Sequence, residues 1–299
     1  MAVICITTSS FDIEANPQLM QLMSRGFEVQ LNPWRKQLSE AQAIEFIGQH
    51  DPIGVIAGVE PWTRAVLDCA PSVRVLSRVG VGTDRIDFAA AAERGVQIRT
   101  TPDAPAPAVA ELTLGLMLSM LRKVSLLDRR LHAREWGKAQ GPLLMGKTVG
   151  VIGYGRIGRR VGELLQAFGA HVLAYDPATA PGELNAVVAN ADIVTLHLPY
   201  APETRGIIDA GVIARMKEGA YLVNASRGGL VDEAALCAAL QSGHLAGAAL
   251  DVFEQEPYAG PLCELDNVVL TPHVGSAAIE VRRRMEAEAV ANLVEALGV

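Results

Sequence analysis

Short apolar runs alternate with longer helix-like segments through the first hundred residues of the chain. The apolar runs have the length and composition of buried strands. The predicted strands are Val3–Thr7, Phe27–Leu31, Gly54–Ala57, Val73–Ser77 and Val96–Arg99. Strands that are apolar along their whole length and alternate with helices are typical of a parallel sheet covered on both faces. This part of the chain therefore predicts an α/β domain built on a doubly wound parallel sheet.

A proline-rich segment, Thr100–Pro107, marks the end of this first domain. Its three prolines stiffen the chain, and a helix is predicted to follow from Val109 to about Arg130.

A second series of strands and helices begins at Thr148. The predicted strands are Thr148–Ile152, Val172–Tyr175, Ile193–Leu196, Tyr221–Val223, Ala248–Leu250 and Val268–Leu270. The last amphipathic helix, from about Ala277 to Leu297, has no further strand to join, so we expect it to pack back on the first domain. We therefore predict two domains, residues 1–100 with the returning helix 277–299, and residues 101–276.

A glycine-rich turn follows the first strand of the second series in the pattern G-x-G-x-x-G. Such glycines permit a tight turn and let a pyrophosphate approach the N-terminus of the next helix. The residues of this turn expected to bind the cofactor are Gly153, Gly155, Arg156, Ile157 and Gly158. Asp176 ends the next strand, about twenty residues further on, where an acid would bind ribose hydroxyls. The segment predicts a dinucleotide site, and we expect NAD because Asp176 would repel a 2′-phosphate.

Three polar signatures follow apolar strands nearer the C-terminus. Arg227 lies in Asn-Ala-Ser-Arg-Gly, Glu256 in Asp-Val-Phe-Glu-Gln-Glu-Pro and His273 in Thr-Pro-His-Val-Gly-Ser. Because ligands bind outside the carboxyl ends of the strands in open α/β sheets, we expect these residues to converge. They supply a cation for a carboxylate, an acid that orients an imidazole, and an imidazole that moves a proton near neutral pH. Glu254 competes with Glu256 for the orienting role, and Glu256 is favoured because Pro257 restricts its backbone.

His197 ends another strand of the second series, in Leu-His-Leu-Pro. We interpret it as a satisfied structural histidine beside the cofactor rather than a catalytic one. The cofactor contacts expected outside the glycine-rich turn are Asp176, His197, Pro199, Thr204, Ala225, Asp251 and Gly275.

Composition and charge narrow the choice of partners. The net charge of −7 argues against a nucleic-acid partner, which needs a basic face. The cysteines show no zinc or disulfide spacing, so no metal site is predicted. No secretion signal or membrane-spanning run is recognised. We expect a cytoplasmic protein with a small-molecule substrate, no membrane partner, and a homodimer formed through the cofactor domain.

These motifs resemble those of the D-isomer-specific 2-hydroxyacid dehydrogenase family, from about Ile53 to Ser276. The resemblance implies a Rossmann-type cofactor domain and a flavodoxin-like substrate domain. It also implies roles for individual residues: Arg227 binds the substrate carboxylate and carbonyl, Glu256 supports the histidine, and His273 is the acid/base. Asp251 would bond the nicotinamide carboxamide.

The segment Gly80–Asp87 resembles the substrate loop of that family, in which backbone amides hold the carboxylate. Its natural donors would be Val79 and Gly80, and Arg78 precedes them, as in short phosphoglycerate dehydrogenase-like members. Those enzymes often carry an arginine in an early strand-end loop where this chain has Glu60. A substrate phosphate would then depend on Arg78, Arg85 or Lys138.

The function expected from this resemblance is NAD-dependent interconversion of a D-2-hydroxy acid and a 2-oxo acid by hydride transfer. The candidate activities are 3-phosphoglycerate dehydrogenase and hydroxypyruvate/glyoxylate reductase. The alternative is a non-enzymatic, NAD(H)-sensing scaffold like the corepressors that share this fold, because such proteins can retain the same three residues.

Overall fold

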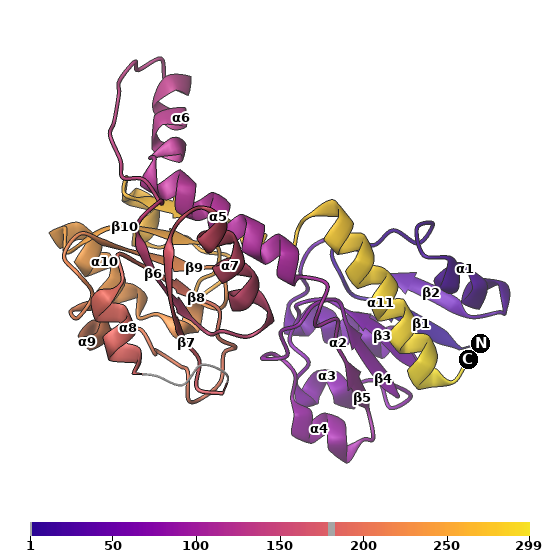
Figure 1. The fold of residues 1–299 in the computed structure, drawn as a ribbon. Coiled ribbons are helices and arrows are strands. Elements are labelled where there is room, and N and C mark those ends of the chain that lie inside the picture. Colours follow the sequence, from indigo (N-terminus) through magenta and orange to yellow (C-terminus); the bar gives the residue numbers. More distant parts are fainter. Residues whose placement is uncertain (1, 179–182) are drawn as a thin grey trace. The chain divides into compact units, whose positions relative to one another are not determined.

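A computed structural model describes residues 2–178 and 183–299 of the chain. The chain divides into two compact units. Unit 1 consists of Met1–Pro105 and Ser276–Val299, and unit 2 consists of Ala106–Gly275. Each unit contains its own parallel sheet (Figure 1).

Unit 1 is built on a five-stranded sheet with the order β2-β1-β3-β4-β5, in which every strand pair is parallel. This is the flavodoxin-like order. Its strands are β1 (Val3–Ile6), β2 (Glu28–Leu31), β3 (Gly54–Ala57), β4 (Val75–Arg78) and β5 (Gln97–Arg99). Its helices are α1 (Pro17–Ser24), α2 (Glu40–His50), α3 (Arg64–Asp68), α4 (Phe88–Glu93) and α11 (Ile279–Leu297).

Helices cover both faces of the unit 1 sheet because alternate strand residues point to opposite faces. Cys5 and Val55 face one cluster with α2, α3 and α4, whereas Ile4 and Ile56 face the other with α1 and α11. The C-terminal helix α11 is anchored to this sheet, since Ser77 Oγ donates to the carbonyl of Ala289 at 2.7 Å.

Unit 2 contains six parallel strands in the order β11-β10-β9-β8-β6-β7. The strands are β6 (Thr148–Ile152), β7 (His171–Tyr175), β8 (Ile193–Leu196), β9 (Ala220–Asn224), β10 (Leu245–Leu250) and β11 (Val268–Leu270). The helices are α5 (Ala106–Leu121), α6 (Val124–His132), α7 (Arg156–Ala167), α8 (Leu184–Asn190), α9 (Ala210–Ile213) and α10 (Glu233–Ser242), with short 3₁₀ turns η1 (Gly228–Leu230) and η2 (Pro261–Glu264). The chain passes from β7 to the other side of β6 to form β8, so the topological switch point lies at β6. Ligands bind at the carboxyl end of the strands at such a point.

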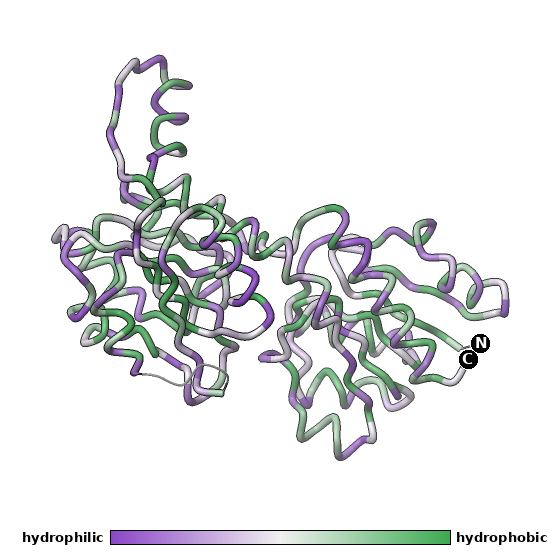
Figure 2. The backbone as a smooth tube through the Cα atoms, in the orientation of Figure 1, coloured by the Kyte–Doolittle hydropathy of each residue, from purple (hydrophilic) through white to green (hydrophobic). Residues whose placement is uncertain are grey.

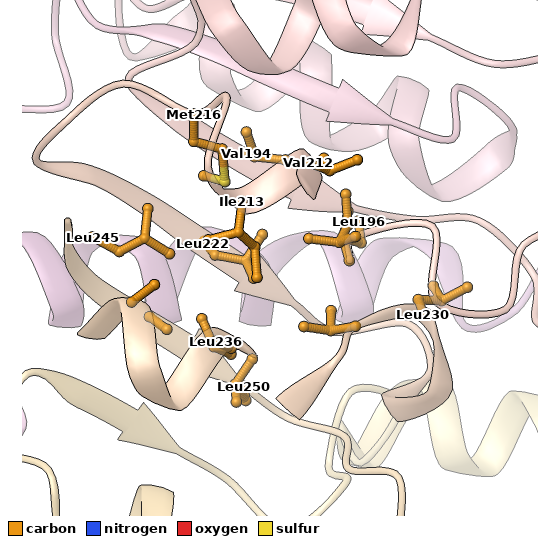
Figure 3. Packing of buried hydrophobic residues seen from close by; sticks show 14 of the residues in the cluster. Val194, Leu196, Val212, Ile213, Met216, Leu222, Leu230, Leu236, Leu245 and Leu250 are labelled. Atoms are coloured by element: carbon orange, nitrogen blue, oxygen red, sulfur yellow. The ribbon is translucent and has the colours of Figure 1, made fainter. Parts of the chain in front are cut away.

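The unit 2 core also has two faces. Val149 and Val151 pack with α5 and α7, whereas Ile152 and Val194 pack with α8, α9 and α10. Figure 3 shows the second cluster, where Leu222 and other leucines from strands and helices meet. Figure 2 shows hydrophobic residues concentrated along the strands of this unit. Truncating such a buried leucine to alanine lowers the free energy of unfolding by about 2–5 kcal/mol. The packing on both faces therefore holds the strands firmly, together with the polar residues at their carboxyl ends.

The predicted class, two doubly wound parallel-sheet domains, is confirmed. One element was predicted wrongly. The single helix expected from Val109 to about Arg130 is divided into α5 and α6, because Lys123 adopts a left-handed conformation with φ 54°. Within the described ranges, no helix is long and apolar enough to cross a membrane.

Candidate active site and cofactor site

The glycine-rich turn lies at the carboxyl end of β6. Gly153 has φ 97°, which favours glycine, and a Cβ there would overlap the backbone of His197. A Cβ at Gly158 would overlap the carbonyl oxygen of Gly153, whereas one at Gly155 would meet nothing within 4 Å. The fold therefore requires two of the glycines, and the third keeps space open in front of α7. Arg156 and Ile157 form the first turn of α7, and its N-cap, Gly155, makes no side-chain cap. This arrangement fits a pyrophosphate.

Asp176 connects the end of β7 to this turn. Its Oδ2 accepts from the backbone N–H of Tyr154 at 2.8 Å, and its Oδ1 accepts from that of Ala178 at 2.9 Å. A carboxylate can accept about four hydrogen bonds, so these two bonds orient the group and are compatible with ribose hydroxyls as further donors. Asp176 thus lies at the end of β7 beside the glycine-rich turn, and its contact with a ribose remains a prediction.

His197 is buried beside the glycine-rich turn. Its Nε2 lies 3.0 Å from Oγ1 of Thr195, and its Nδ1 has no hydrogen-bond partner among the described residues. Burial lowers the pKa of His197 to about 3, so the ring is neutral at physiological pH. The expectation of a fully satisfied histidine was therefore wrong for Nδ1. A neutral ring that cannot readily be charged is unsuited to acid/base catalysis, and its orphaned nitrogen fits a position next to a polar ligand.

The other expected cofactor residues lie in loops at the carboxyl ends of unit 2 strands. Thr204 Oγ1 donates to the carbonyl of Pro199 at 2.8 Å, which closes the loop after β8. Ala225 is buried directly after β9. Gly275 follows β11, and its N–H donates to Asp251. Their cofactor contacts remain predictions.

His273 and Glu256 form a direct pair. The His273 Nδ1 lies 2.9 Å from Oε2 of Glu256, and the other oxygen, Oε1, accepts from the N–H of Phe253 at 3.1 Å. With Nδ1 bonded to the carboxylate, Nε2 is the nitrogen left for a substrate. The side chain of His273 is 40% exposed. Glu256, and not Glu254, therefore occupies the orienting position.

The loop that carries His273 is held by Asp251, whose residue exposure is 0%. Its Oδ1 accepts from Thr271 Oγ1 at 2.6 Å and from Val274 N at 2.8 Å, and its Oδ2 accepts from Gly275 N at 2.8 Å. Burial raises the pKa of the Asp251 carboxyl. Asp251 thus organises the loop around His273, which has the left-handed φ of 54° that such a loop must support. Its contact with a nicotinamide carboxamide remains a prediction.

Arg227 lies on a tight turn after β9. Asn224 forms this turn, since its Oδ1 accepts from Ser226 N at 3.0 Å and its Nδ2 donates to the Arg227 carbonyl at 2.8 Å. Gly228 allows the turn to pack closely, because a Cβ there would overlap the carbonyl carbon of Phe253. Asn224 and Gly228 of the Asn-Ala-Ser-Arg-Gly signature therefore hold the backbone of Arg227 close to the loop that leads to Glu256.

In the loop after β4 in unit 1, the two backbone amides that were expected to hold a carboxylate have other acceptors. The N–H of Val79 donates to the Ala57 carbonyl at 2.9 Å, and that of Gly80 donates to Thr101 Oγ1 at 2.8 Å. The Arg78 guanidinium folds back on the Val79 carbonyl. Both amides expected to hold a carboxylate are thus already used within unit 1. Within residues 2–178 and 183–299, the amides of Val81 and Gly82 donate to no protein acceptor. Sequence reasoning missed them because the hydrogen bonds of the sheet continue past the end of β4 as far as Val79.

Comparison with known proteins agrees with this geometry. Residues 114–275 match the family described as "D-isomer specific 2-hydroxyacid dehydrogenase, NAD binding domain". The chain belongs to this dehydrogenase family. Its matched segment lies within unit 2, which is therefore the NAD-binding part of the chain.

Three relatives show the breadth of the family. D-3-phosphoglycerate dehydrogenase of Mycobacterium leprae is 44% identical over 73% of this chain and 44% of its own length. Hydroxypyruvate reductase of Thermotoga maritima is 36% identical over 88% of this chain and 90% of its own length. The crystal structure of the TT0316 protein from Thermus thermophilus superposes with a TM-score of 0.88 at 35% identity, covering 99% of this chain and 97% of that one. The chain spans about half the length of the phosphoglycerate dehydrogenases that it matches.

Proposed function

We propose that this family member is an oxidoreductase that interconverts a D-2-hydroxy acid and a 2-oxo acid with NAD. The observation that carries the proposal is the Glu256–His273 pair at 2.9 Å, on loops of the same unit as the glycine-rich turn. An oriented imidazole beside a dinucleotide site is the arrangement that carbonyl reduction requires.

The three proposed catalytic residues have separate tasks. The bound nicotinamide supplies or accepts the hydride. In the reductive direction His273 donates a proton from Nε2 to the carbonyl oxygen, and in the oxidative direction it takes that proton from the hydroxyl. Glu256 holds Nδ1 and thereby fixes the orientation of the ring. Arg227 presents a planar guanidinium to the carboxylate and the polarised carbonyl. Proton transfer of this kind contributes about 10²- to 10⁴-fold to the rate.

We further propose that unit 1 binds the substrate carboxylate through the backbone amides of Val81 and Gly82. This replaces the original assignment to Val79 and Gly80, whose amides serve the sheet and Thr101. Arg78 remains a proposed substrate contact.

Glu60 bears on the choice of substrate. It is 2% exposed and accepts from the N–H of Gly58 at 3.1 Å, from Trp62 Nε1 at 2.8 Å and from the hydroxyl of Thr7. A buried acid therefore occupies the strand-end loop in which a phosphate-binding arginine was sought. This favours substrates that carry a small uncharged group, such as hydroxypyruvate or glyoxylate, over 3-phosphoglycerate.

We also propose a homodimer formed through unit 2. Figure 1 shows α6 and the segment after it extending away from the unit 2 sheet. No residue of α6 is buried, and Leu131 and Trp136 are 56% and 85% exposed. Light scattering tests this: the wild type should have the mass of a dimer, and Leu131→Asp should be a monomer. A monomeric wild type would contradict it.

The cysteines described are unpaired, which supports a reducing, cytoplasmic location.

The reaction is tested by a panel of 2-oxo acids assayed with NADH, including phosphorylated and unphosphorylated members. We expect turnover of at least one small unphosphorylated acid, and the D-hydroxy acid as product. Tight NADH binding without turnover of any member would instead support the sensing scaffold.

A further inference from the structure

Two adjacent backbone amides in the loop after β10 are held by two different carboxylates. The N–H of Phe253 donates to Glu256, and the N–H of Glu254 donates to Oε1 of Glu233 at 2.6 Å. Glu233 is the first residue of α10, which follows the Arg227 turn and η1. It therefore reaches from a helix that is fixed in the core to the loop that carries Glu256.

The peptide that Glu233 holds is also where two site loops meet. The Arg227–Gly228 turn packs on the Phe253–Glu254 peptide so closely that Gly228 has no room for a Cβ. Glu256 lies two residues further along and contacts His273. A displacement of this one peptide would therefore move the partner of His273 and the support of Arg227 together.

The electrostatics agree with this placement. Burial raises the pKa of Glu233, the hydrogen bond from the Glu254 amide opposes the rise, and the charges of Glu254 and Glu256 add to it. The charge of Glu256 is thus close enough to raise the pKa of Glu233, although the hydrogen bond of Glu233 goes to a backbone amide.

We propose that Glu233 is a positioning residue, which holds the Glu254 amide and thereby sets Glu256 against His273 and seats the Arg227 turn. Its effect on turnover rests on the proposed function. Its effect on the geometry of His273 does not, so the two can be tested separately.

Two substitutions separate the hydrogen bond from the charge. Glu233→Gln keeps an oxygen that accepts from Glu254 N, whereas Glu233→Ala removes the acceptor. The matched control is Glu254→Gln, which removes an exposed neighbouring charge and leaves the Glu254 amide in place. Thermal unfolding of all variants identifies any that fail to fold.

The first readout is NMR and needs no substrate. In Glu233→Ala, the Glu254 amide proton should move upfield and the Nδ1 resonance of His273 should shift, although Glu233 does not bond that ring. Both signals should stay close to wild type in Glu233→Gln and Glu254→Gln. A His273 resonance unchanged in Glu233→Ala would overturn the proposal.

The second readout is the steady-state reduction of the best 2-oxo acid. Glu233→Ala should lower kcat about tenfold or more, because misplacement of reacting groups is costly, with the Kd for NADH unchanged and the activity recovered in Glu233→Gln. Equal losses in Ala and Gln variants would show that charge matters and not the hydrogen bond, which would overturn the positioning role. If the wild type turns over no acid, the proposed function fails and the NMR result alone decides the role of Glu233.

Discussion

Gly155 offers a substitution that separates cofactor binding from folding. A Cβ at this position meets nothing within 4 Å, and its φ of −76° is open to alanine. Alanine is a poorer N-cap than glycine, but it also reduces the entropy of the unfolded chain. Because these effects oppose each other, Gly155→Ala should change the unfolding free energy of the cofactor-free protein by less than about 1 kcal/mol.

The added methyl group would stand where a pyrophosphate approaches α7. Crowding by one such group costs about 1–3 kcal/mol, which corresponds to about 5- to 150-fold weaker NADH binding. At a concentration 100 times the wild-type Kd, NADH should stabilise the wild type by about 2.7 kcal/mol. A variant with 100-fold weaker binding would gain only about 0.4 kcal/mol at that concentration.

The assay is denaturant unfolding with and without NADH, together with a Kd from NADH fluorescence. Gly158→Ala is the matched control, because its Cβ overlaps the Gly153 carbonyl oxygen and should destabilise the protein even without NADH. If Gly155→Ala bound NADH as tightly as the wild type, the glycine-rich turn would not be the pyrophosphate site.

Three further predictions concern other residues of unit 2. Burial lowers the pKa of His197 from 6.5 to about 3, so the folded protein keeps the ring neutral while the unfolded chain takes up a proton below pH 6.5. The unfolding free energy of the wild type should therefore fall by about 2 kcal/mol between pH 7 and pH 5, and this loss should be absent in His197→Gln. The control is His171→Gln at an exposed position, whose unfolding free energy should change with pH as that of the wild type does. Asp176→Ala should narrow the preference for NADH over NADPH in kcat/KM, and equal use of both cofactors by the wild type would refute the role of that acid. Glu256→Gln should lower kcat/KM for the oxo acid with the Kd for NADH unchanged, because an amide has one acceptor oxygen and cannot replace both carboxylate oxygens, one bonded to His273 Nδ1 and one to the N–H of Phe253; a variant with wild-type kcat/KM would exclude Glu256 as the orienting acid.

The strands were predictable because each is an apolar run that ends at a polar or glycine residue. Those of unit 2, such as Ile193–Leu196 and Val268–Leu270, match the predicted ranges to within a few residues. The break between α5 and α6 was not predictable in this way, since Lys123 enters the left-handed region and hydrophobic periodicity carries no information about a single φ. Periodicity therefore determines layers and misses local backbone conformation.

The candidate site shows the same division. The contact between Glu256 and His273 was predictable from their signatures, because the carboxyl ends of neighbouring parallel strands meet at one edge of the sheet. The hydrogen bonds of Asp251 and the amides already used at Val79 and Gly80 depend on loop geometry that no spacing reveals. Glu233 was missed because an acid in the first turn of a helix is common for electrostatic reasons alone.

The central claim is tested most directly by following the hydride itself. Wild-type protein is incubated with NADH deuterated at the transferred position and a small 2-oxo acid, and the product is examined by mass spectrometry and chiral chromatography. We predict a D-2-hydroxy acid with deuterium at C2, and a loss of at least about 100-fold in kcat/KM for Arg227→Lys with NADH affinity intact, because an ammonium cannot make the planar double contact. Unlabelled product, or an Arg227→Lys variant within a few-fold of the wild type, would contradict the proposed reaction or its substrate anchor.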